Sequence, residues 1–237
     1  MPGINRIAAK REGTPRRASR ASASKKTEPE DVHFLAKRLD EFLYTPQRES
    51  NGRGGRFSAS AIGNPCDRFL YYHYHGKLPQ QEIPGQLKRI FDHGNITQDR
   101  YKSYFQRMGI FLADEVEAKY ANPPISGRAD YVLRIVPEYM KFIVELKTIK
   151  ASGFNKLVAP KPEHEVQLRV YLMLLDVLNG AVLYECKDNQ KVKSFHVTHD
   201  AKIWDDLIAR LTRIQDMTEA PSFPEKHDYY CNCLMVR

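Results

Sequence analysis

The sequence lacks any hydrophobic run long enough to cross a membrane. The longest apolar stretch, residues 170–178, is interrupted by Asp176, whereas a membrane-spanning helix needs about 20 apolar residues. The first residues also lack the charged-then-apolar pattern of a secretory signal peptide. We therefore expect a soluble protein with no membrane partner, located in the cytoplasm, which is the host cytoplasm if the source is a phage.

Cysteine is equally scarce, with 4 in 237 residues. So few cysteines in a chain of this length do not form a disulfide framework, which favours a reducing compartment. The composition, 42% hydrophobic and 28% charged, is ordinary for a globular protein and excludes wholesale disorder. The length suits one domain or two.

Acidic residues are nearly absent from the first 27 positions. This segment carries eight Lys and Arg residues against the single Glu12, a net charge of +7, whereas the whole chain carries +8. With little to bury, residues 1–27 are predicted to be a disordered basic tail that precedes a folded domain over residues 28–237. Such a tail can bind phosphate, can solubilise or target the protein, or can serve as a mitochondrial transit peptide.

Within the folded part, helical periodicity dominates first and strand alternation follows. The order is helices, three strands, a helix, two strands and a final helix, which indicates an α/β fold with a central mixed sheet flanked by helices. The predicted helices run from the Thr27/Glu30 capping box to Leu43, from the N-cap Asn64 to Tyr74, from Pro84 to Gly109, from Pro162 to Leu178, and over residues 203–217. The predicted strands are residues 116–120, 128–136, 141–147, 182–187 and 192–198.

Two carboxylates occupy the predicted hairpin of residues 128–147. Glu145 and Lys147 are two residues apart on one strand, so their side chains leave the same face, which we expect to lie outside the core because two charges would otherwise be buried. Asp130 on the other arm can lie beside Glu145. Like charges that close are costly unless a cation lies between them, and hard oxygen ligands favour Mg²⁺ or Mn²⁺.

Two further features flank this hairpin in the sequence. His93 lies off the apolar stripe of its predicted helix, next to Gly94, where a helix can approach another element closely. Gln167 and Tyr171 are separated by four residues on the helix that begins at Pro162, so they share one face. Each of these residues taken alone is equally compatible with an ordinary structural role.

Taken together and in this order, the features resemble the PD-(D/E)XK nuclease superfamily. The resemblance rests on four motifs, which are the helical His93, Gly127-Arg128-Ala129-Asp130, Val144-Glu145-Leu146-Lys147, and Gln167 with Tyr171. The sequence is most similar to the RecB-like exonuclease branch, which includes CRISPR-associated and mitochondrial single-strand exonucleases and phage nucleases. The resemblance covers residues 57–197 and implies a restriction-endonuclease-like αβββαβ core.

The resemblance also implies roles for individual residues. Asp130, Glu145, the backbone carbonyl of Leu146 and His93 would hold Mg²⁺ or Mn²⁺. Asp130, Glu145 and Lys147 would be the catalytic residues. Lys147 would orient or deprotonate the attacking water. The residues that would contact DNA are Gln167, Tyr171 and Arg128.

The implied activity is DNA phosphodiester hydrolysis by an exonuclease acting on single-stranded DNA or DNA ends, in recombination, repair or phage DNA processing. A structure-specific endonuclease, such as a junction or flap resolvase, is the first alternative, because the same site can serve both. A nucleic-acid-binding module that does not cleave is the second.

The cysteines resemble a further feature of this branch. Some members hold an iron–sulfur cluster with one Cys before the nuclease core and three after it. In this chain Cys66 matches the early position, but only Cys231 and Cys233 follow the core, so Cys186 would have to be recruited. A Zn²⁺ site that uses His227 is an alternative, and reduced thiols without a metal are another.

Overall fold

The computed structural model describes residues 34–46, 54–79, 81–135, 140–223, 231 and 233. The predicted tail of residues 1–27 and the Thr27/Glu30 capping box lie outside these ranges. The helices are α1 Phe34–Leu43, α2 Asp67–Tyr74, α3 Gly85–Arg107, α4 Ala151–Phe154, α5 Pro162–Leu174 and α6 Ala201–Gln215. The strands are β1 Phe57–Ser58, β2 Phe111–Ala121, β3 Pro124–Ile135, β4 Met140–Ile149, β5 Asn179–Cys186 and β6 Val192–Thr198.

The six strands form one mixed sheet. Its main order is β1-β3-β4-β5-β6, and β2 pairs with β3 beside this path. Pairing is parallel for β1 with β3 and for β4 with β5, and antiparallel elsewhere. Apart from the short α4, the segment from α3 through β2, β3, β4 and α5 to β5 has the order αβββαβ, so the predicted fold class is confirmed.

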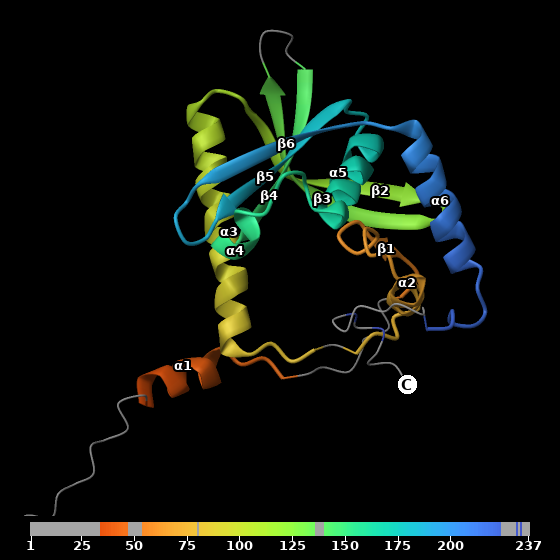
Figure 1. The fold of residues 1–237 in the computed structure, drawn as a ribbon, viewed down its shortest axis with the longest axis horizontal. Coiled ribbons are helices and arrows are strands. Elements are labelled where there is room, and N and C mark those ends of the chain that lie inside the picture. The colour runs from red at the N-terminus through yellow and green to blue at the C-terminus, as the bar shows by residue number, and fades with distance from the viewer. Residues whose placement is uncertain are drawn as a thin grey trace, which may run out of the picture.

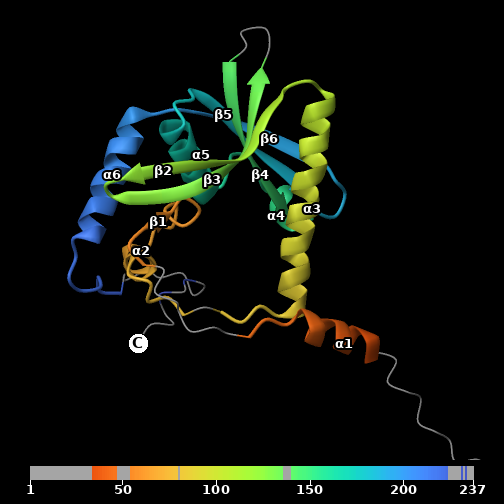
Figure 2. The ribbon, with the colours of Figure 1, turned by 180° about the vertical axis from the view of Figure 1, so that it is seen from behind.

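Helices cover both faces of this sheet. Figures 1 and 2 view the sheet from opposite sides and show α5 and α6 over one face and α3 over the other. The core is divided accordingly, because the α5 face packs the larger apolar cluster and the α3 face a smaller one. The smaller cluster consists of Tyr101, Phe105, Tyr131, Leu133 and Val144. The sheet is therefore buried on both sides, as α/β domains require.

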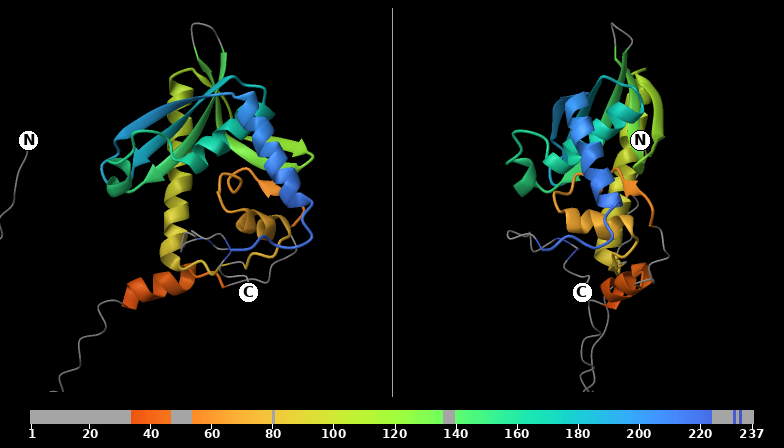
Figure 3. Two further views of the ribbon diagram at one scale, coloured as in Figure 1. Left: turned by 45° about the vertical axis from the view of Figure 1, so that its right-hand side comes forward. Right: turned by 90° about the vertical axis from the view of Figure 1, so that its right-hand side faces the viewer.

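Helix α1 contacts the far end of α3, away from the sheet (Figure 3). It has no buried residue among those described. Of the helices that the structure describes, none is both long enough and apolar enough to cross a lipid bilayer.

The start of α2 differs from the prediction. The sequence indicates Asn64 as the N-cap, but the helix begins at Asp67 and its cap is Cys66, whose Sγ accepts a hydrogen bond from the backbone N–H of Phe69 at 3.3 Å. Asn64 acts one step earlier, because its Oδ1 accepts from the backbone N–H of Cys66 at 2.8 Å. The preference of Asn for caps is weaker than this local pairing.

The end of α5 also differs. The predicted helix to Leu178 stops at Leu174, because Asn179 and Gly180 belong to β5 and pair with β4. A Cβ on Gly180 would lie 2.6 Å from the carbonyl oxygen of Ile143. This glycine is therefore a point of close strand contact and not a helix terminator.

Candidate metal and nuclease site

Asp130 lies on β3, between the part of the strand that pairs with β1 and the part that pairs with β4. The first part of β3 pairs with β1 and its last part, from Tyr131 onward, pairs with β4. The Oδ2 atom of Asp130 accepts a hydrogen bond from the backbone N–H of Leu146 at 2.8 Å. The pairing of Tyr131 with Val144 places Asp130 opposite Glu145 on the neighbouring strand. The two carboxylates are therefore side by side, as the hairpin predicts.

Glu145 lies deeper than the sequence analysis expects. It is 1% exposed, which corrects the expectation that its face of the strand lies outside the core; α5 packs over that face. Its Oε1 lies 2.7 Å from Lys147 Nζ. Its Oε2 is buried and has no hydrogen-bond partner among the described residues, which is a costly state for a carboxylate oxygen.

Burial controls the ionisation of both acids. Removal from water raises the pKa of Glu145, and the neighbouring Asp130 raises it further, while Lys147 opposes the shift. Burial likewise raises the pKa of Asp130, and the hydrogen bond from Leu146 opposes it. A positive ion next to these oxygens would reverse the cost, because an opposite charge favours the ionised form.

Lys147 begins a chain of polar side chains that leads to α5. Its Nζ donates to Gln167 Oε1 at 3.1 Å, and Gln167 Nε2 donates to Tyr171 Oη at 3.3 Å. The predicted shared face of Gln167 and Tyr171 is thus present. Both side chains are buried, with 6% and 2% exposure. Gln167 contacts Lys147 on the sheet and Tyr171 contacts Gln167, and their implied role on DNA stays a prediction.

His93 and Arg128 are at the surface. His93 is exposed on α3, one turn before the buried Thr97, whose Oγ1 donates to the His93 carbonyl at 2.8 Å. The described residues do not bring a His93 nitrogen and the oxygens of Asp130 and Glu145 within 4.8 Å of one another. Arg128 pairs with Glu115, with Nη1 2.9 Å from Oε2, and its side chain is largely exposed.

Two residues of this site were missed by the sequence analysis. Gln98 Nε2 on α3 donates to Asp130 Oδ1 at 3.3 Å and to Glu115 Oε1 at 2.9 Å. Glu115 lies on β2, one residue before the alternation that predicts that strand. A signal was available, because counting back from the turn at 122–124 along the hairpin places Glu115 opposite Asp130. Nothing in the sequence pattern indicates that Gln98 reaches both acids.

The structure brings three of the four cysteines together. Sulfur atoms of Cys66, Cys231 and Cys233 all lie within 4.8 Å of one another, and Cys66 Sγ is 3.6 Å from Cys233 Sγ. Cys186 is buried elsewhere, at the end of β5. Three sulfurs are one ligand short of the four that structural zinc or an iron–sulfur cluster uses. His227 lies outside the described residues, so we assign no cofactor to this trio.

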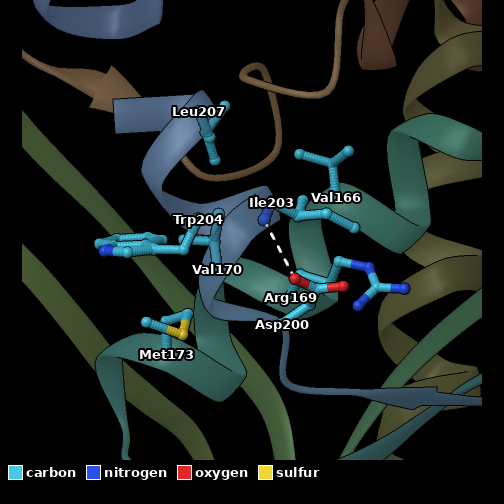
Figure 4. A pocket seen from close by; sticks show the side chains of 8 residues that line it. All are labelled: Val166, Arg169, Val170, Met173, Asp200, Ile203, Trp204 and Leu207. Atoms are coloured by element: carbon cyan, nitrogen blue, oxygen red, sulfur yellow. Dashed lines mark hydrogen bonds between the residues drawn. The ribbon is translucent and has the colours of Figure 1, made fainter. Parts of the chain in front are cut away.

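A separate apolar pocket lies between α5 and α6 and contains none of these candidate residues. Figure 4 shows Trp204 and Leu207 of α6 facing Val170 and Met173 of α5. The dashed line marks the hydrogen bond by which Asp200 Oδ1 accepts from the Ile203 backbone N–H at 3.1 Å and caps α6. This pocket therefore belongs to helix packing.

The donor set around Asp130 and Glu145 suits a hard divalent cation. Two carboxylates lie on adjacent strands, and one buried oxygen has no described partner. Oxygen donors of this kind are those that Mg²⁺ and Mn²⁺ prefer. The positive Lys147 adjoins Glu145, so the site combines two carboxylates that could hold a cation with a fixed positive side chain.

No protein-family model and no curated protein matches this chain. Among solved structures, an alkaline exonuclease from Laribacter hongkongensis has a TM-score of 0.50 at 12% sequence identity, covering 70% of this chain and 89% of its own. The same enzyme in complex with dAMP has a TM-score of 0.48 at 10% identity, covering 68% and 86%. A phage-related exonuclease from Haemophilus somnus has a TM-score of 0.40 at 15% identity, covering 52% and 67%.

At such low identity, similarity is evidence of a shared fold and not of a shared reaction. The match at a TM-score of 0.50 extends over most of both chains, and the element order agrees with it. The chain therefore has an α/β fold, with a mixed six-stranded sheet flanked by helices, that is consistent with a restriction-endonuclease-like fold.

Proposed function

We propose that this chain is a divalent-metal-dependent deoxyribonuclease of the RecB-like type that acts as an exonuclease on single-stranded DNA or DNA ends. The observation that carries the proposal is the buried Glu145 Oε2 without a described partner, next to Asp130 and Lys147. An ionised carboxylate held this way is costly unless a cation binds it. The chain shares its fold with an alkaline exonuclease, so the scaffold is compatible with this reaction, and the site residues carry the proposal.

In this proposal Asp130, Glu145 and the Leu146 carbonyl would hold Mg²⁺ or Mn²⁺. A bound ion of this kind supplies a Lewis acid that activates water and stabilises negative charge on phosphate oxygens. The resemblance also makes His93 on α3 a candidate for a further ligand. Asp130 is already oriented for this task, since the Leu146 N–H fixes one of its oxygens.

Lys147 supplies the fixed positive charge. Its Nζ is held from two sides, by Glu145 Oε1 at 2.7 Å and by Gln167 Oε1 at 3.1 Å, which leaves a further N–H to donate to the attacking water or to a phosphate oxygen. Gln167 and Tyr171, being buried, act by positioning Lys147. Arg128 is exposed and is the residue that we assign to the DNA backbone.

The deciding experiment is a digest of end-labelled linear and circular single-stranded DNA with Mg²⁺ or Mn²⁺. We expect loss of the linear substrate and survival of the circles, and we expect Asp130→Asn to abolish cleavage. Glu117→Gln is the matched control, because Glu117 is an exposed acid on β2 paired with Lys119, and it should cut normally.

Other outcomes select the alternatives. Degradation of circles, or cleavage confined to branched duplexes, would replace the exonuclease with a structure-specific endonuclease. Binding of DNA without cleavage of any single-stranded, duplex or branched substrate would leave a nucleic-acid-binding module.

A further inference from the structure

Three carboxylates lie in one row across β2, β3 and β4. Asp130 on β3 is flanked by Glu115 on β2 and by Glu145 on β4. The pairs that establish this row are Asp114 with Tyr131 and Val116 with Ala129 between β2 and β3, and Tyr131 with Val144 between β3 and β4. Side chains directly opposite each other on neighbouring strands lie about 5 Å apart, so like charges in such a row repel.

The side-chain amide of Gln98 lies between Glu115 and Asp130. Gln98 Nε2 donates to Glu115 Oε1 at 2.9 Å and to Asp130 Oδ1 at 3.3 Å. Only the NH₂ end of the amide can face two carboxylates, because its oxygen would be repelled by both. The chemistry of the two acids therefore fixes which way this amide points.

Further contacts hold both Gln98 and Glu115 in place. The backbone carbonyl of Gln98 accepts a hydrogen bond from Tyr131 Oη at 2.5 Å, which ties this turn of α3 to β3. Glu115 is held by Arg128 at its other oxygen. Its backbone φ is 50°, a left-handed conformation that non-glycine residues rarely adopt. An amide anchored in this way restricts the carboxylate that it contacts.

We propose that Gln98 and Glu115 are positioning residues of the metal site: Glu115 orients the Gln98 amide, and that amide fixes the Asp130 carboxylate. With the Leu146 N–H on Oδ2 and Gln98 on Oδ1, Asp130 has one defined orientation. Groups that orient a metal ligand in this way typically contribute 10- to 100-fold to metal affinity or activity. This inference rests on the proposed function, because it presumes that Asp130 binds the ion.

The test begins with Mn²⁺ binding measured by calorimetry on the full chain without DNA. Gln98→Leu keeps the side-chain bulk and removes the amide, so we expect about 10-fold weaker Mn²⁺ binding. Gln106→Leu is the matched control, since Gln106 is an exposed glutamine on the same helix. It should bind Mn²⁺ like the wild type.

Cleavage kinetics and a double variant extend the test. Gln98→Leu should lower kcat while KM for DNA stays unchanged, because the amide acts on a metal ligand and not on DNA. Glu115→Leu should lower kcat to the same degree, and the kcat of the double variant should be no lower than that of either single variant, because both residues act on Asp130 through the one hydrogen bond from Gln98. Glu115→Gln keeps an accepting oxygen and should restore Mn²⁺ affinity to within about 3-fold.

The outcomes separate this inference from the proposed function. If Gln98→Leu lowers only the unfolding temperature and leaves Mn²⁺ affinity and kcat unchanged, or if the single effects add in the double variant, the positioning role is wrong. If the wild type cleaves no DNA, the proposed function is wrong, and the Mn²⁺ affinities still decide whether Gln98 positions Asp130.

Discussion

A carboxylate buried in a protein usually has a partner for each oxygen, and Glu145 has a described partner for only one. Lys147 holds Oε1 at 2.7 Å, while Oε2 is buried without a described contact. Ion pairs in the interior recover their desolvation cost only when the remaining lone pairs are also satisfied. At the scale of single residues, this imbalance is the observation on which the proposed cation site rests.

Replacing Glu145 should abolish the stabilisation of the protein by divalent ions. We expect Mn²⁺ to raise the unfolding temperature of the wild type, because a ligand that binds only the folded state stabilises it. Glu145→Gln keeps the size and loses the charge, so Mn²⁺ should no longer raise its unfolding temperature. Thermal unfolding with Mn²⁺ and with chelator measures this, and Glu117→Gln should still respond. An undiminished Mn²⁺ response in Glu145→Gln would contradict the assignment.

His164 gives a pH dependence of known sign. Burial, with Lys147 and Lys161 nearby, lowers its pKa to about 3, and its Nδ1 lies 2.8 Å from Tyr184 Oη. The pKa in the unfolded chain is about 6.5, so below that pH the unfolded state binds more protons and folding stability falls as the pH falls toward 3.

His164→Gln should therefore be less sensitive to acid than the wild type. Because the side chain is partly exposed, the difference is at most about 1 kcal/mol per pH unit below pH 6.5. Urea unfolding at several pH values measures it. Equal loss of stability in the two proteins between about pH 6.5 and about pH 5 would contradict a neutral, partly buried His164.

At the scale of elements, the site depends on how closely α5 approaches β3. Gly127 makes this approach possible, because a Cβ there would lie 2.6 Å from the Ala59 Cβ and 2.8 Å from Tyr171 Oη. Tyr171 in turn accepts from Gln167, which contacts Lys147. The packing of one helix on one strand therefore sets the position of the lysine.

Gly127→Ala should disturb stability and activity together. The added methyl group overpacks the contact between α5 and β3, at a cost of about 1–3 kcal/mol, and displaces the chain that holds Lys147, so kcat should fall. Gly94→Ala is the control, because nothing lies within 4 Å of a Cβ there and alanine in a helix interior gains up to about 1 kcal/mol. Denaturant unfolding compares them, and equal stability of the two variants would refute the packing argument.

At the scale of the whole molecule, the positive charge and the candidate site belong to different segments. Residues 1–27 carry +7 of the net +8. The site itself is a row of acids whose negative charge is offset by Lys147 and Arg128, and the neutral Gln98 donates a hydrogen bond to this row. The candidate chemistry therefore lies in the folded part, whereas most of the long-range attraction for DNA should come from the N-terminal segment.

Removal of residues 1–27 should weaken DNA binding and leave cleavage at saturating DNA unchanged. Each lost phosphate contact should lower the salt dependence of log K by about 0.7 for a single strand. Binding titrations over a range of salt concentrations measure this. A full-length variant with the eight basic residues of the segment changed to Gln separates charge from length and should match the truncation. Loss of cleavage at saturating DNA would contradict this division.

Much of the fold was predictable because it depends on local patterns. Alternation and helical spacing gave the order of elements, and the two hairpins follow from short turns between alternating segments. Local rules failed where a tertiary contact competes with them. Cys66 replaced Asn64 as a cap, and Gly180 entered a strand because β4 approaches it closely.

The sequence by itself determined the composition of the candidate site: Asp130, Glu145 and Lys147 on a hairpin, with Gln167 and Tyr171 on one face of the next helix. Only the tertiary structure decided that Glu145 is buried, and that Gln167 contacts Lys147 while Tyr171 contacts Gln167. It also decided that Gln98 and Glu115 lie at the site. The physical reason is distance along the chain. Strand periodicity fixes which neighbours share a face, but burial and the hydrogen bonds of α3 and α5 arise from packing between segments that the pattern does not relate.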